Sequence, residues 1–203
     1  MTSAPGYCVI HEFLLANTLQ QLVNLLAQRQ GLFKPVGRVS DGVRVLDAFD
    51  SLHEPLTTAV LDPLSEVAPR CGMTPPDPRG VELRVWSRIN DYLEPTHDAT
   101  VDDRALGFVL FLHREPRAFE GGSLHLHTPM GESIIEPSQN SMIFFSNSVA
   151  TRAGAVRPAS RALIDSRLTL EGWIHTCPVP ATENDVCSRY AIVDAHGTGE
   201  ILP

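Results

Sequence analysis

A change in hydrophobic periodicity near residue 81 is the feature that most constrains the fold of this 203-residue chain. Before this point apolar residues recur at helical spacing, and after it they alternate with polar residues in short runs bounded by Gly, Pro, Asn and Asp. The alternating runs predict strands over 81–89, 106–113, 123–128, 132–137, 141–146 and 168–175. Many short strands that follow helices are typical of an α+β domain with a β-sandwich or barrel.

Two amphipathic helices are expected before the strands. The first ends at about residue 31 and has Asn17 or Thr18 as its N-cap. The second covers 51–72, begins with a capping box and is either kinked or split at Pro63.

Composition and charge restrict the classes of protein that this chain can belong to. A hydrophobic fraction of 43% suffices for one core, so we expect a single domain with a helical support region (1–80), a β core (81–177) and an extension (178–203). Sixteen basic minus 24 acidic residues give a net charge of −8, which disfavours nucleic acid and anionic membranes as partners. The absence of a signal-peptide pattern and of an apolar run of about 18 residues predicts a cytoplasmic protein.

An ordered series of motifs runs through the strand-rich half, over 90–98, 104–113, 119–124, 142–146 and 165–174. In order and spacing this series resembles the prolyl-hydroxylase type of iron(II)- and 2-oxoglutarate-dependent oxygenase. The resemblance implies an α+β fold with a double-stranded β-helix, or jelly-roll, core supported by the N-terminal helices.

The same resemblance implies an iron site made of a His-x-Asp pair and a later, distal His. In the ungapped register the proximal His falls on Thr96, the Asp on Asp98, and the distal His on Thr151. Threonine hydroxyls are weak, neutral ligands, so ordinary iron loading is expected to fail and no cofactor is expected. Two further positions where the family often has an aromatic hydroxyl carry Ser87 and Phe111, which we expect to line the ligand pocket.

Arg167 stands in an Arg-x-Thr pattern with Thr169, and this pattern matches the residues that hold the distal carboxylate of 2-oxoglutarate in the family. The resemblance therefore implies a small carboxylate-bearing ligand anchored by Arg167. The alternative is structural, with Arg167 paired to Asp165 or Glu171.

Histidines leave a metal site open as an alternative. His125 and His127 share one strand face, and His97 or Asp98 would complete the ligand set. The opposing interpretation places both strand histidines in solvent. Asp98 is either a general acid or base with a raised pKa in a partly apolar cavity, or a hydrogen-bonded turn residue.

Three functions are consistent with these patterns. The leading hypothesis is a repurposed oxygenase-fold enzyme without the iron triad, which catalyses redox-neutral elimination, isomerisation, cyclisation or hydrolysis of a small anionic substrate. Asp98 would move the proton, while Thr96 and Thr151 donate hydrogen bonds. The second is a working oxygenase, hydroxylase or halogenase-like, that binds Fe(II) and 2-oxoglutarate through unusual ligands. The third is a non-catalytic module that senses a carboxylate or scaffolds a partner.

Overall fold

The computed structural model of the protein describes residues 2–4, 6–36, 42–47, 58–59, 62–63, 81–88, 104–128 and 130–175. The pairs 58–59 and 62–63 are helical and belong to the second expected helix, most of which lies outside the described residues. The motif at 90–98 and the extension at 178–203 lie outside them as well.

The described elements are one α-helix, short 3-10 turns and many strands. The first part of the chain contains β1 (Thr2–Ala4), β2 (Tyr7–Ile10), α1 (Ala16–Gln28), η1 (Gln30–Leu32), β3 (Lys34–Pro35) and β4 (Val43–Asp47). The middle contains β5 (Val81–Arg88), β6 (Arg104–Phe111), β7 (Phe119–Gly121), β8 (Leu124–Thr128), β9 (Gly131–Ile135) and β10 (Met142–Ser146). There follow β11 (Ala150–Ala153), β12 (Val156–Pro158), η5 (Leu163–Asp165) and β13 (Arg167–His175).

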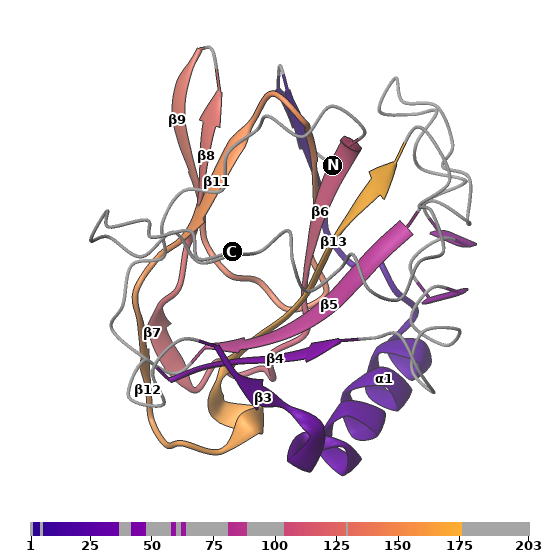
Figure 1. Ribbon diagram of the computed structural model, residues 1–203, viewed down its shortest axis with the longest axis vertical. Helices are drawn as coiled ribbons and strands as arrows, with labels where there is room; N and C mark the ends of the chain where they lie inside the picture. The colour runs from indigo at the N-terminus through magenta and orange to yellow at the C-terminus, as the bar shows by residue number, and fades with distance from the viewer. Residues whose placement is uncertain are drawn as a thin grey trace, which may run out of the picture.

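The strands form one large sheet and two small ones. The large sheet has the order β1-β2-β10-β6-β13-β5-β4-β3, and the small sheets have the orders β11-β8-β9 and β12-β7. Figure 1 shows α1 against one side of the large sheet and the small sheets on the other side. Sequence neighbours are often far apart in this order, which is the crossing pattern of a jelly roll.

All six strands expected from alternation are present, with ends that differ by at most about two residues. The chain before residue 81 does more than support the core, because β1 to β4 extend both edges of the large sheet. Alternation did not reveal β7, β11 and β12, since these strands have only three or four residues. Such lengths are too short for a period of two to be distinguished from a turn.

The start of α1 differs from the expectation that Asn17 or Thr18 is its N-cap. The N-cap is Leu15, which makes no side-chain capping bond. The chain enters the helix through a tertiary contact instead: the Leu14 amide donates to the side-chain oxygen of Asn140 at 2.8 Å. Because this contact fixes the entry, the helix begins without a polar cap of its own.

The core lies on both faces of the large sheet. One apolar cluster joins Leu22 and Leu26 of α1 to the sheet residues Leu83, Val85 and Leu110. A second cluster lies between the large sheet and the small ones and includes Val109, Phe111, Leu126, Ile143 and Phe145. Within the described residues, no helix has the length and apolar character required to span a membrane.

Candidate functional site

Strands β5 and β13 carry polar side chains on the face that points between the sheets. Along each strand every second residue belongs to the apolar cluster against α1, so the intervening residues face the other way. These intervening residues are Glu82, Arg84, Trp86, Arg167, Thr169, Glu171 and Trp173. The neighbouring strands β6 and β10 contribute apolar residues to the same interior. One half of the barrel interior is therefore charged and the other half is apolar.

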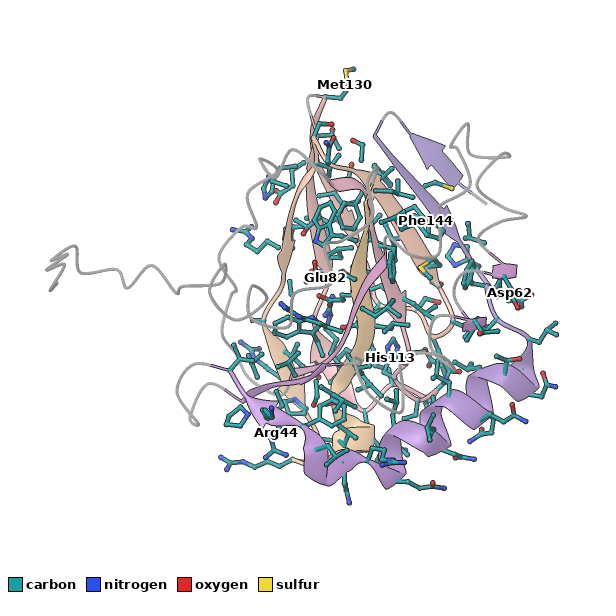
Figure 2. The ribbon with its side chains drawn as sticks, turned by 45° about the vertical axis from the view of Figure 1, so that its right-hand side comes forward. Arg44, Asp62, Glu82, His113, Met130 and Phe144 are labelled. Carbon is teal, nitrogen blue, oxygen red and sulfur yellow. The ribbon has the colours of Figure 1, made fainter. Side chains whose placement is uncertain are left out.

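A cavity of about 110 Å³ lies in this interior. Its wall contains the charged and aromatic residues Glu82, Arg84, Trp86, Glu171 and Trp173, together with residues of β6, β10 and β11. Figure 2 shows the side chain of Glu82 in the middle of the molecule, among the strands. The cavity is thus the place where a small polar ligand can meet several charged groups.

Thr151 reaches this cavity from the opposite sheet. It lies on β11, is 8% exposed, and pairs in register with Leu126 of β8. The next residue, Arg152, points away from the cavity, and its Nη2 lies 3.5 Å from Oε1 of Glu132 on the outer surface. The structure therefore places the residue expected at the distal-ligand position in the cavity wall.

Arg167 is completely buried at the start of β13. Its Nε donates to the carbonyl oxygen of Gly122 at 2.6 Å, and its Nη1 lies 3.4 Å from Oε1 of Glu171. The guanidinium carbon lies 5.1 Å from the centre of the Phe111 ring, which provides a cation–π contact. These contacts bring together two of the residues expected to bind ligand, Arg167 and Phe111.

Gly122 makes the approach of Arg167 possible. Its φ is +74°, and a Cβ at this position would lie 2.8 Å from Cδ of Arg167. Any larger residue would therefore be strained and would also displace the arginine stem. The Gly121-Gly122 pair, which the sequence marks only as a turn, is a structural requirement of the buried guanidinium.

Thr169 and Glu171 complete the surroundings of Arg167. Thr169 is fully buried, and its hydroxyl donates to Oε1 of Glu171 at 2.6 Å. The same carboxylate oxygen faces Nη1 of Arg167. Of the two structural partners considered for Arg167, Glu171 is the one in contact, because Asp165 pairs with Arg114 at 2.8 Å.

Ser87 lies on the other face of β5 from the cavity residues. It is 2% exposed and donates a hydrogen bond to Oγ of Ser166 at 3.0 Å. The alternation of β5 turns this side chain toward the α1 side of the sheet. The structure therefore does not bring Ser87 together with Arg167 and Thr169.

His125 and His127 lie on the face of β8 opposite Leu124 and Leu126, which are in the core. Nδ1 of His125 donates to Glu132 at 2.9 Å, and Nε2 of His127 lies 3.7 Å from the same carboxylate. The hydrogen bond from His125 holds the pKa of Glu132 below its usual value. In the part of the chain that the structure describes, no three His, Cys, Asp or Glu side chains form a group suited to a metal ion.

Thr96, His97 and Asp98 all lie outside the described residues. Their assignments as proton carrier, hydrogen-bond donor and alternative metal ligand stay predictions.

His113 is a buried ionisable residue that the sequence did not single out. It is 1% exposed, and neither ring nitrogen has a hydrogen-bond partner. Its pKa is lowered to about 4, chiefly by burial; Glu115 opposes this shift, while the nearby cations Arg167 and Arg117 add to it. The ring is therefore neutral at physiological pH, and it packs edge-on against Phe111 and Phe119.

The sequence analysis also did not identify the interior-facing residues of β5. Glu82, Arg84 and Trp86 alternate with Leu83 and Val85, and an amphipathic strand ordinarily turns its polar face to water. Here α1 covers the apolar face, so the polar face is left to line the barrel interior. The alternation is the signal that could have found these residues, but only with knowledge that both faces are covered.

Comparison with known proteins agrees with this architecture. Residues 85–175 match the sequence profile of the 2OG-Fe(II) oxygenase superfamily. The structure of a prolyl-4-hydroxylase from Pseudomonas putida superposes with a TM-score of 0.61, at 19% identity over 84% of this chain and 92% of the other. A 2OG-Fe(II) oxygenase-family oxidoreductase from Burkholderia pseudomallei superposes with a TM-score of 0.65, at 15% identity over 86% of each chain.

A curated relative in Synechocystis is described as an uncharacterised PKHD-type hydroxylase. It is 29% identical over 126 residues, which cover 55% of this chain and 41% of the relative. The match thus spans about two fifths of the relative's length. In the sequence of its strand-rich half and in its fold, the chain resembles the prolyl 4-hydroxylase type of 2-oxoglutarate-dependent oxygenase.

Proposed function

We propose that this protein is an enzyme that uses the oxygenase fold without an iron triad. It catalyses redox-neutral chemistry, an elimination, isomerisation, cyclisation or hydrolysis, on a small substrate that carries a carboxylate. The superfamily match over 85–175 supports an enzyme of this fold class. The departure from oxygenase chemistry rests on the residues of the site.

Thr151 is the observation that carries the proposal. Its side chain lines the cavity, and the family resemblance assigns the distal histidine to this residue. A neutral hydroxyl is a poor substitute for imidazole on a divalent first-row metal, so the described side chains do not fit an iron centre at this place. A threonine can still donate a hydrogen bond to a substrate oxygen, and this is the role we assign to it.

Arg167 and Thr169 support the choice of a carboxylate substrate. Both are fully buried, and they converge on the carboxylate oxygen of Glu171. A guanidinium and a hydroxyl that hold one carboxylate in the folded protein have the chemistry needed to hold a carboxylate of a ligand. The Phe111 ring packs over the guanidinium of Arg167, which is fully buried.

Proton transfer is assigned to Asp98, with Thr96 as a second hydrogen-bond donor. A carboxylate that points into a partly apolar cavity has the raised pKa that a general acid or base needs, and this proposal requires Asp98 to point that way. If the reaction depends on this group, Asp98→Asn lowers turnover by roughly 10² to 10⁴.

Metal analysis and a coupled assay test the proposal directly. Protein purified from iron-supplemented cells is expected to contain far less than one iron per chain. It is also expected to form no succinate when 2-oxoglutarate and oxygen are added. Iron near one equivalent together with succinate formation would refute the proposal and establish a working oxygenase.

Restoring the imidazoles tests the register of the site. We expect Thr96→His combined with Thr151→His to create iron affinity that is measurable by metal titration. Thr96→His alone is the matched control, since it lacks the second nitrogen ligand. If the double variant binds no more iron than the control, Thr151 does not stand at the distal-ligand position.

A further inference from the structure

We infer that Glu171 is an internal occupant of the carboxylate anchor, and that a ligand carboxylate must displace it to reach Arg167 and Thr169. This inference rests on the proposed function, because it concerns the same anchor. It assigns to Glu171 a role in setting ligand affinity and specificity that is separate from proton transfer.

The first step of the argument is geometric. Oε1 of Glu171 receives the Thr169 hydroxyl at 2.6 Å and lies 3.4 Å from Nη1 of Arg167. One oxygen atom thus meets both groups of the Arg-x-Thr pattern. The Thr169 hydroxyl has a single proton, so a carboxylate from outside the chain cannot accept from this hydroxyl and pair with Arg167 at the same place while that oxygen stays where it is.

The second step concerns charge. A second carboxylate beside Glu171 would place like charges against each other in a partly desolvated cavity, which is unfavourable. The described side chains of this interior face already pair carboxylates with guanidinium groups: Arg167 with Glu171, and Arg84 with Glu82 at 3.4 Å. An added anion therefore competes with a carboxylate of the protein rather than adding to the site.

The third step is that Glu171 is able to leave. Arg167 and Thr169 are fully buried, whereas the side chain of Glu171 is 19% exposed and lines the cavity. The contact with Arg167 is long at 3.4 Å and involves a single carboxylate oxygen. A bidentate pair from a ligand would be shorter and stronger than this contact.

The presence of Glu171 in the anchor also explains how Arg167 is stabilised when no ligand is bound. A buried guanidinium without an anion is costly, and Glu171 provides that anion in the free protein. The 2-oxoglutarate that the superfamily name implies does not fit beside this arrangement. It would need the position that the Glu171 carboxylate holds.

The test is a calorimetric titration of the intact protein with succinate and with 2-oxoglutarate as probes. Glu171→Ala is expected to bind at least one of them about tenfold or more tightly than wild type, since the ligand no longer replaces a charge-assisted hydrogen bond. Glu82→Ala is the matched control, because it removes a cavity carboxylate of similar exposure, 16%, that is paired with Arg84 instead.

Two further variants separate occupancy from a change in overall charge. Glu171→Gln keeps the shape but loses the charge, and we expect it to bind the probe more tightly than wild type. Adding Thr169→Val to Glu171→Ala removes the anchor hydroxyl with little change in volume, and we expect most of the gain to disappear.

Several outcomes would overturn the inference. Equal affinities of wild type and Glu171→Ala, no binding by either, or the same gain in Glu82→Ala would each show that Glu171 does not occupy a carboxylate site. None of these results measures iron or succinate formation. The failure of this inference is therefore distinguishable from the failure of the proposed function.

Discussion

The buried histidine His113 should make the protein lose stability in mild acid. Its pKa in the fold is about 4, against 6.5 for the free side chain, chiefly because burial disfavours the charged ring. Between these two values the unfolded chain binds a proton that the folded protein does not. His113 therefore causes no loss of stability above about pH 6.5 and a growing loss as the pH is lowered from there to about 4. Below about pH 4 its contribution to the loss no longer grows.

The magnitude follows from the size of the pKa shift. Each pH unit within this window is worth about 1.4 kcal/mol, so His113 alone should remove about 2.5 kcal/mol of unfolding free energy between pH 7 and pH 4.5. This is a large fraction of the roughly 5–15 kcal/mol that stabilises a typical domain. The effect should appear as a clear shift of the urea midpoint.

Two neutral replacements isolate this effect. His113→Phe suits the edge-on contacts with Phe111 and Phe119, whose ring centres lie 5.8 and 5.0 Å away. His113→Leu is a second variant that leaves more room, and a cavity of about 20 Å³ already borders this side chain. Neither ring nitrogen has a hydrogen-bond partner, so the replacements remove only the 3.6 Å contact between Nε2 and Oε1 of Glu115.

Urea unfolding of wild type and both variants at pH 7 and pH 4.5 measures the difference. We expect wild type to lose about 2.5 kcal/mol more than either variant over this interval. An NMR titration of the ring protons gives the folded pKa independently. Equal losses in all three proteins, or a folded pKa near 6.5, would refute the reasoning that burial keeps this ring neutral.

Two other predictions concern stability. Arg167→Met should lower the unfolding free energy by about 3–5 kcal/mol, because the Glu171 carboxylate loses its partner. In urea unfolding, the double variant Arg167→Met with Glu171→Met should lose less free energy than the sum of the losses in the two single variants. Strict additivity would contradict a direct pairing. Gly172→Ala places a Cβ against backbone and 2.7 Å from the Phe108 ring, so it should cost more than about 2 kcal/mol or prevent folding. Gly31→Ala, which meets nothing within 4 Å, should change the thermal midpoint little, and similar losses in both variants would refute the steric argument.

The strand-rich half shows how far local pattern reaches. Alternation along 81–89 and 168–175 identified β5 and β13, and the turn residues between other runs separated β8, β9 and β10. These features are local, because a period of two and a Gly or Asn turn are decided by residues close in sequence. The motif order also led to the fold, since the jelly roll has a fixed succession of strands.

The family resemblance also pointed to residues of the candidate site. The resemblance to the oxygenase family singled out Arg167 with Thr169 as an Arg-x-Thr pattern, and both side chains are fully buried in the structure. Thr151 was placed by the pattern that follows it, and it lines the cavity.

Other features depend on contacts between segments far apart in the chain. Alternation divides β5 into two faces, but only the position of α1 decides that Glu82 and Arg84 face the interior. The buried position of Arg167 depends on Gly122, which is 45 residues earlier and reaches it only through the crossing of strands. The low pKa of His113 likewise arises from burial, a property of the packed fold. The sequence by itself determined the strands and their two faces, whereas tertiary packing decided which face became the site, because burial and charge pairing act between segments that only the folded chain brings together.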